Sequence, residues 1–169
     1  MLHPTLQATA ESLVLQFDQL PTERKTLLTE LTRFVQQSPA GQPVYLNFIC
    51  THNSRRSHIA QLWAQASADY FGVKDIVCFS GGTEATAFNP RAVKAIQEAG
   101  FQINIEVPGD NPLYKVSYSP NASSITVFSK KYDDPKEFDG TPLESAKYVE
   151  RVQQIGREML YAFSKIKGS

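Results

Sequence analysis

The chain has few of the features that assign a protein to a specialised class. Its 169 residues hold only two cysteines, Cys50 and Cys78, which argues against the disulfide framework of a secreted protein and favours a reduced, cytoplasmic setting. No apolar run approaches the roughly 18 residues of a membrane span, and the N-terminal residues lack the apolar segment of a signal peptide. The formal net charge is zero, so no overall field favours nucleic acid or a membrane, and any anion site must be local.

The length predicts one globular domain, and a change of pattern separates it from a helical extension. Apolar residues recur at helical spacing in residues 6–20 and again in residues 22–37, where Thr22 is the expected N-cap after Pro21. The second segment should carry one apolar face, formed by Leu27, Leu28, Leu31, Phe34 and Val35. The break SPAGQP predicts an extension of residues 1–42 and a main domain of residues 43–169. The extension could pack on the domain or form a homodimer or other partner surface, and its pattern does not distinguish these.

The main domain begins with alternating strands and helices. Residues 44–49 and 75–80 are short β-rich runs of the kind buried in parallel sheets. Helical segments follow at residues 54–71 and 89–100, the second with Asn89 as N-cap and Gly100 as its stop. This order predicts an α/β fold in which the two strands are parallel. Residues 114–119 and 123–132 predict an antiparallel hairpin, and a capping box at Thr141 opens a final helix.

The stretch NFICTHNSRRSHIAQ, residues 47–61, crowds hydrogen-bond donors and positive charge around one sulfur. A turn between a strand and a helix directs backbone N–H groups into one concavity, and the helix N-terminus adds positive potential. There Cys50 should be a thiolate near neutral pH, and Arg56 could present a planar fork to an oxyanion. Asn53 tolerates a left-handed turn, and Ser57 could donate to the sulfur. The plainer alternative, a buried Cys50 beside solvated arginines, leaves the clustering unexplained.

The octapeptide CTHNSRRS resembles the C-x5-R-S loop of low-molecular-weight protein tyrosine phosphatases and of the thioredoxin-coupled arsenate reductases that share their fold. The resemblance continues through SGGTEATAFNPRAVKAIQEAGF and implies a three-layer α/β fold with a small parallel sheet. It implies that Cys50 is the nucleophile, Arg56 the oxyanion clamp and Ser57 the partner of the thiolate. The implied oxyanion-binding set is Thr51, His52, Asn53, Ser54, Arg55, Arg56 and Ser57.

The family also uses an aspartate before proline as general acid, which implies that role for Asp134. Without the cysteine loop, an ordinary Asp–Asp–Pro turn would be the simpler interpretation. Two loop positions depart from the family pattern. His52 replaces a glycine and either lines the mouth of the site or is a surface imidazole. Arg55 replaces a cysteine or apolar residue and should add positive charge at the rim.

The chain departs further from the reductases that pass oxidation to a cysteine pair, because it has nothing resembling their segment C-S-D-A-D-x-N-C-P. Its other thiol, Cys78, lies in the apolar run IVCF and fits an inert core residue better than a redox partner. Longer relatives resembling this protein have two separate segments, one like YDDP and one like DPKEFDG. In this chain the two segments are fused in YDDPKEFDG, residues 132–140. Either the run ITVFSKKY takes a position in the sheet, or the sheet is smaller than is usual in the family.

The leading hypothesis is a cysteine-dependent phosphomonoester hydrolase that acts on a small phosphomonoester or a phosphotyrosine protein. Two alternatives stay open: an arsenate reductase resolved by an external thiol, and a non-catalytic protein that binds phosphate or arsenate. We expect no cofactor and no metal, since His3, His52 and His58 form no ligand set with the cysteines. We expect neither nucleic acid nor a membrane as partner.

Overall fold

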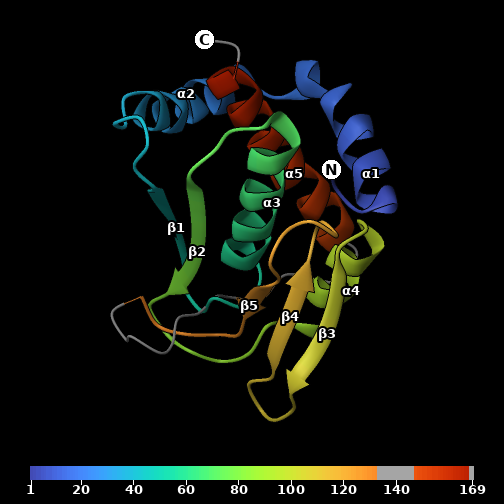
Figure 1. Cartoon of the computed structure of the whole chain (residues 1–169). Coiled ribbons are helices and arrows are strands. Elements are labelled where there is room, and N and C mark those ends of the chain that lie inside the picture. The colour runs from blue at the N-terminus through green and yellow to red at the C-terminus, as the bar shows by residue number, and fades with distance from the viewer. Residues whose placement is uncertain (133–146, 168–169) are drawn as a thin grey trace.

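The computed structural model describes residues 1–132 and 147–167, and in the last helix the side chains from residue 153 onward (Figure 1). The helices are α1 (Pro4–Val14), α2 (Thr22–Gln36), α3 (Arg56–Phe71), α4 (Pro90–Glu98) and α5 (Lys147–Lys167), with a short 3-10 turn at Phe17–Gln19. The strands are β1 (Val44–Cys50), β2 (Ile76–Gly82), β3 (Gln102–Val107), β4 (Leu113–Ser117) and β5 (Ile125–Val127). None of the helices in the described ranges is long and apolar enough to cross a membrane.

Strands β1 and β2 form the predicted parallel pair, joined by the crossover helix α3. The register runs from Val44 opposite Ile76 to Cys50 opposite Gly82. Side chains alternate across the pair: Leu46 is buried toward α3, whereas Tyr45 on the next position is 62% exposed. The α/β class and the small parallel sheet are therefore confirmed.

The remaining strands form a separate antiparallel sheet in the order β3-β4-β5. The predicted hairpin is confirmed, with Tyr114 opposite Val127 and Val116 opposite Ile125. The sequence did not predict β3, which pairs with β4 on the other side. The run ITVFSKKY does not join the parallel pair as a strand: its one bridge to the pair, in the described residues, is an isolated parallel bridge between Lys131 and Gly82. Of the two alternatives predicted for this region, the described residues therefore show the second: a parallel sheet of only two strands, which ITVFSKKY does not extend.

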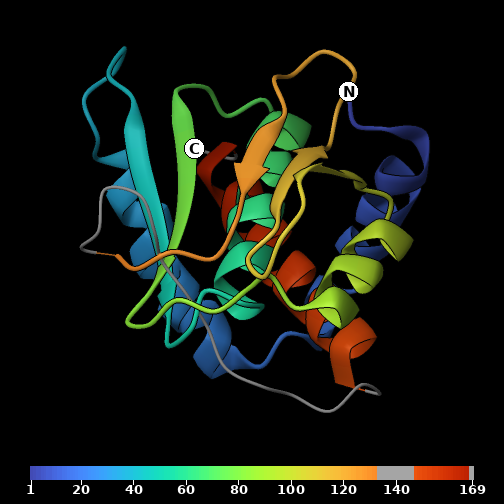
Figure 2. The ribbon, with the colours of Figure 1, turned by 90° about the horizontal axis from the view of Figure 1, so that it is seen from below.

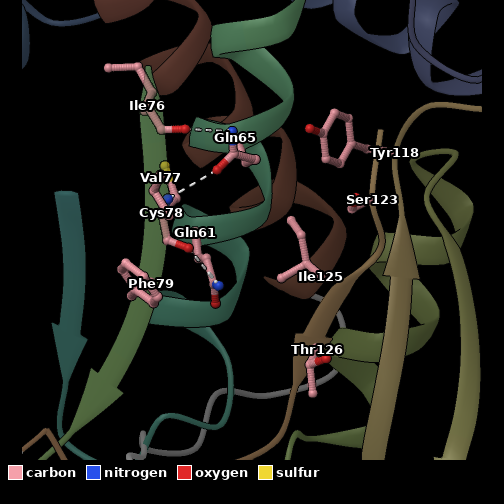
Figure 3. A pocket seen from close by; sticks show the side chains of 10 residues that line it. All are labelled: Gln61, Gln65, Ile76, Val77, Cys78, Phe79, Tyr118, Ser123, Ile125 and Thr126. Atoms are coloured by element: carbon pink, nitrogen blue, oxygen red, sulfur yellow. Dashed lines mark hydrogen bonds between the residues drawn. The ribbon is translucent and has the colours of Figure 1, made fainter. Parts of the chain in front are cut away.

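A cavity of about 460 Å³ separates β2 from the antiparallel sheet, and Figure 3 shows the side chains that line it. Helix α3 supplies the hydrogen bonds that a neighbouring strand would otherwise make with this edge of β2. Gln65 donates to Ile76 O at 3.0 Å and accepts from Cys78 N–H at 3.0 Å, and Gln61 donates to Cys78 O at 2.9 Å. Because these amides satisfy the backbone polar groups, the edge of β2 is stable without a partner strand.

The N-terminal helices pack on the rest of the chain. Leu6, Ala10 and Leu13 of α1 are buried in the same hydrophobic core as Trp63 of α3 and Phe163 of α5. Helix α5 contacts α1, α2 and α3, and its course through the molecule can be followed in Figure 2. The extension therefore packs on the domain in this structure, and a homodimer or other partner surface on it stays a prediction.

Two details predicted for α2 are wrong. Thr22 is the first helical residue, and Pro21, which precedes it, occupies the N-cap position without a side-chain hydrogen bond. The expected apolar face is buried only in part. Val35 is buried, but Leu27 and Phe34 are each 56% exposed, because α2 contacts α5 along a narrower strip than the apolar pattern spans.

Candidate active site

The cysteine loop, residues 50–57, connects the end of β1 to the start of α3, as the sequence predicts. Cys50 is the last residue of β1 and is half-buried. Asn53 has the left-handed φ of +38° that lets the chain turn sharply, and α3 begins at Arg56. The N-terminus of this 16-residue helix therefore points at the loop and gives it positive electrostatic potential.

The carbonyl groups of the cysteine loop are turned outward. Thr51 O accepts from the N–H groups of Thr83 and Glu84, at 2.7 and 2.9 Å. Three more loop carbonyls accept from outside the loop: His52 O from Ser129, Ser54 O from Asn89, and Arg55 O from Ile59. In a planar trans peptide the next N–H points opposite to the carbonyl. The amides of His52, Asn53, Arg55 and Arg56 therefore face the loop interior, where they can bind a tetrahedral oxyanion.

A buried hydrogen-bond chain supports the cysteine. Cys50 Sγ lies 3.0 Å from Ser57 Oγ, within hydrogen-bond distance. Asn53 Nδ2 donates to the same oxygen at 2.8 Å, and both Asn53 and Ser57 are almost fully buried. Since Ser57 Oγ accepts from Asn53, its own hydrogen is available for a Cys50 thiolate.

Behind the loop lies a second polar cluster that includes Lys130 and His58. Lys130 Nζ donates to Ser80 O at 2.9 Å, and His58 Nδ1 lies 2.9 Å from Ser80 Oγ. Burial lowers the pKa of Lys130 to about 8. Burial, and then the nearby charge of Lys130, hold the pKa of His58 well below its usual value, so this imidazole is neutral at neutral pH.

A cavity of about 240 Å³ opens beside Cys50. Cys50, Arg56 and Ser57 contribute to one wall, and α5 contributes the apolar Ile155 and Met159. The remaining wall includes an ion pair, in which Arg24 Nε of α2 lies 3.6 Å from Glu158 Oε1 of α5. The cavity therefore offers an apolar surface next to the sulfur, with a charged pair beside it.

The other predicted site residues have mixed outcomes. Arg56 is exposed and lines the Cys50 cavity. The expected rim charge at Arg55 is wrong, because only 6% of this residue is exposed at the turn into α3. The side chain of His52 is about one-fifth exposed, and its Nε2 lies 3.7 Å from Glu84 Oε2. Asp134 and the Thr141 capping box lie outside the described residues.

Sequence reasoning missed several residues that the fold brings to the site. Ser129 donates to His52 O and accepts from Thr86 N–H, so it links the cysteine loop to the segment after β2. Lys130, Arg24 and Glu158 also reach the site from distant positions. The one signal for Ser129 and Lys130 was that they directly follow the β-rich run ITVF, residues 125–128. No pattern of residue type or spacing pointed to Arg24 or Glu158.

No group of three or more His, Cys, Asp or Glu side chains in the described ranges is arranged as a metal site. Cys78 is buried in the core, and burial raises its pKa to about 12. Four register positions separate it from Cys50, since Leu46 pairs with Cys78 and Cys50 with Gly82. At ~3.3 Å per residue the two cysteines lie roughly 13 Å apart along the strands. A disulfide needs Cα atoms within about 7 Å, so these two cannot form one without rearrangement.

A cysteine at the end of a parallel strand, followed by a tight loop and a helix N-terminus, is an arrangement typical of α/β proteins that hold an oxyanion beside a cysteine. Comparison with known proteins agrees with it. The family described as low molecular weight phosphotyrosine protein phosphatase matches residues 45–111. Arsenate reductase of Bacillus subtilis is 30% identical over 128 residues, covering 66% of this chain and 89% of that protein.

Two further relatives carry the same name. Arsenate reductase of Bacillus licheniformis is 29% identical over 134 residues, covering 70% of this chain and 93% of its own length. Arsenate reductase of Staphylococcus aureus strain Newman is 43% identical over 58 residues, covering 34% of this chain and 40% of its own length. The chain belongs to the superfamily of low molecular weight phosphotyrosine protein phosphatases and arsenate reductases.

Proposed function

We propose that the protein is a phosphomonoester hydrolase that works through a phosphocysteine intermediate on Cys50. The sulfur attacks phosphorus in line, so that an S–P bond forms as the bond to the leaving oxygen breaks. The inward amides of the cysteine loop and the Arg56 guanidinium stabilise the three equatorial oxygens. Water then attacks the phosphocysteine, and phosphate leaves as the S–P bond breaks.

The position of the second thiol, Cys78, favours hydrolysis over an intramolecular redox relay. Cys78 is buried and separated from Cys50 by four register positions, so no thiol of this chain can resolve an oxidised Cys50 without rearrangement. Hydrolysis needs only one sulfur. The apolar residues Ile155 and Met159 in the Cys50 cavity also suit an aryl leaving group, such as the side chain of phosphotyrosine.

Asp134 is the general acid in this proposal. It protonates the leaving oxygen and then takes a proton from the attacking water. Support comes from Tyr132, the last described residue before the Asp133–Asp134 pair. Tyr132 N–H donates to Gly82 O at 2.9 Å, and Gly82 is directly opposite Cys50 in the parallel register.

A second candidate is arsenate reduction with an external thiol, and the names of the curated relatives favour it. Cys50 would attack arsenic and displace water. An external thiol such as glutathione would then attack the Cys50 sulfur, so that arsenite leaves and a mixed disulfide forms. A second external thiol would regenerate Cys50. Both activities fit a reducing compartment such as the cytoplasm, where thiols stay reduced.

Hydrolysis of p-nitrophenyl phosphate by three proteins tests the proposal: wild type, Cys50→Ser, and Cys78→Ala as the matched control. We expect turnover in wild type and Cys78→Ala, competitive inhibition by arsenate, and a loss of several orders of magnitude in Cys50→Ser. Turnover that survives in Cys50→Ser would overturn the proposal. If wild type hydrolyses nothing but forms arsenite with added glutathione, the reductase is the correct assignment.

A further inference from the structure

Two opposite charges form part of the wall of the cavity beside Cys50, and the mechanism proposed above does not use them. Arg24 of α2 and Glu158 of α5 both line this cavity, and Arg24 Nε lies 3.6 Å from Glu158 Oε1. That separation is too long for a hydrogen bond, so the contact between the two side chains is only electrostatic. Each side chain therefore keeps hydrogen-bonding capacity for a ligand.

The unused capacity lies on specific atoms. The two polar side-chain contacts of Glu158 in the described ranges both involve Oε1, which also accepts from Gln154 Nε2 at 2.9 Å. The second oxygen, Oε2, has no hydrogen-bond partner in the described part of the chain. Arg24 contacts Glu158 through Nε, so the two terminal nitrogens of its guanidinium remain available for an acceptor. The pair thus offers one acceptor oxygen and one fork of donors.

Burial makes the unused oxygen of Glu158 significant. Glu158 is only 9% exposed, and a carboxylate removed from water is costly unless its oxygens are hydrogen-bonded. The Arg24 side chain is 45% exposed, so solvent screens its charge and it compensates Glu158 only in part. A donor supplied by a ligand in the cavity would complete the environment of Oε2. A charged donor such as an ammonium group would do so more strongly than a neutral one.

The rest of the cavity limits what carries that ammonium group. Its volume is about 240 Å³, and a cavity of about 150 Å³ already holds benzene, so an aryl ring and several further atoms fit. Ile155 and Met159 supply an apolar surface for the ring, and the cysteine loop supplies the site for the phosphate. Arg24 matches a carboxylate on the same ligand, since a guanidinium binds a carboxylate through two parallel hydrogen bonds.

We propose that Arg24 and Glu158 are specificity-determining residues that select a phosphomonoester with a zwitterionic leaving group. Glu158 binds the ammonium group and Arg24 binds the carboxylate of a free phosphorylated amino acid, of which O-phospho-L-tyrosine fits the apolar wall. A phosphotyrosine inside a protein chain carries neither of these two backbone charges and is not preferred. The inference rests on the proposed function in placing the phosphate on the cysteine loop, and it does not depend on Asp134.

Four ligands that share one phenol test the inference: O-phospho-L-tyrosine, its N-acetyl form, its amide, and its N-acetyl amide. They carry both backbone charges, the carboxylate alone, the ammonium alone, and neither charge. Isothermal titration calorimetry with the full chain carrying Cys50→Ser measures their dissociation constants without turnover. We expect O-phospho-L-tyrosine to bind roughly tenfold tighter than its N-acetyl amide, with each single charge giving part of this gain.

Two substitutions assign the gain to the two residues. Glu158→Gln keeps the size of the side chain and an acceptor for Gln154, and it should remove the gain from the ammonium group while leaving the gain from the carboxylate. Arg24→Gln should do the reverse. The matched control is Glu98→Gln, which removes a carboxylate from the exposed ion pair with Lys94 and should leave all four dissociation constants unchanged. A purely structural role of the Arg24–Glu158 pair would weaken all four ligands equally.

Equal binding of the four ligands to Cys50→Ser would overturn the inference, and so would the absence of binding by any of them. An equal loss of affinity for all four ligands in Glu158→Gln would also overturn it. If circular dichroism shows that Glu158→Gln is unfolded, the four ligands decide with Arg24→Gln alone: the inference is wrong if that variant keeps the gain from the carboxylate.

Binding to Cys50→Ser requires no hydrolysis, so this inference and the proposed function can fail separately. If O-phospho-L-tyrosine is preferred but wild type hydrolyses none of the four ligands, the proposed function fails and the ligand selectivity stands. If wild type hydrolyses p-nitrophenyl phosphate through Cys50 but the four ligands bind equally, only the inference fails.

Discussion

Replacing Gly100 with alanine should release the N-terminal helix from the domain. Gly100 ends α4 with a φ of +109°, a conformation that side chains with L chirality rarely adopt. A Cβ at this position would lie 2.3 Å from Leu6 N and 2.7 Å from Leu6 Cα. Both are backbone atoms, so no side-chain rotation relieves the clash. The first turn of α1 would have to move away.

Two contributions lower the free energy of unfolding of Gly100→Ala. The strained φ contributes on the order of 1–3 kcal/mol. Moving α1 also exposes Leu6, which is fully buried, and burial of such a side chain is worth about 1.5–3 kcal/mol. We therefore expect Gly100→Ala to lose roughly 3–5 kcal/mol, a large share of the 5–15 kcal/mol typical of a domain.

Guanidinium denaturation followed by circular dichroism measures this loss. The matched control is Gly41→Ala, because Gly41 also has a positive φ, +77°, but a Cβ there meets nothing within 4 Å. Gly41→Ala should lower the free energy of unfolding only by the backbone strain at its positive φ, about 1–2 kcal/mol. Equal losses in the two variants would refute the reasoning, since they would mean that the close approach of α1 to Gly100 contributes nothing.

Three further outcomes are expected. The folded state holds the Lys130 proton less tightly than the unfolded chain, since burial lowers this pKa from 10.5 to about 8. Wild type should therefore gain about 3 kcal/mol relative to Lys130→Met as pH rises from 8 to 10.5, and a flat difference in denaturation would contradict this. Arg24→Ala should raise KM for p-nitrophenyl phosphate more than it lowers kcat, because Arg24 lines the cavity beside Cys50; a purely kcat effect would argue against leaving-group binding there. Asn89→Ala removes the hydrogen bond to Arg91 N–H and should cost about 1 kcal/mol in thermal unfolding, with no effect on Cys50 alkylation.

Local patterns in the sequence were sufficient to predict the strand, loop and helices that form the site. The β-rich run before Cys50 and the helical spacing after it predicted β1, the cysteine loop and α3, because strand and helix periodicities differ. Asn89 and Gly100 marked the ends of α4, since capping and left-handed turns need particular residue types. The same local logic failed at Thr22, where Pro21 holds the cap position instead.

Burial was harder to predict, because it depends on what packs against each side chain. Leu27 and Phe34 fit an apolar face but remain exposed, and Arg55 fits a charged rim but is buried. Neither outcome can be derived from residue type or spacing alone. Strand β3 was missed although Ile103, Ile105 and Val107 alternate with polar residues as in a strand; its pairing with β4 is visible only in the structure.

Residue types and their spacing were enough to identify the groups that could perform the chemistry: a cysteine, an arginine and a serine at the spacing of an oxyanion loop, in a chain with one other thiol. What surrounds these groups follows from the packing of the elements. The tertiary structure separated Cys78 from Cys50 along the sheet, placed Arg24 and Glu158 at the cavity beside the sulfur, and set Lys130 behind Asn53. The contacts of Arg24 with Glu158 and of Asn53 with Lys130 join residues more than 70 positions apart, so they depend on how the elements pack and not on the pattern within any one of them.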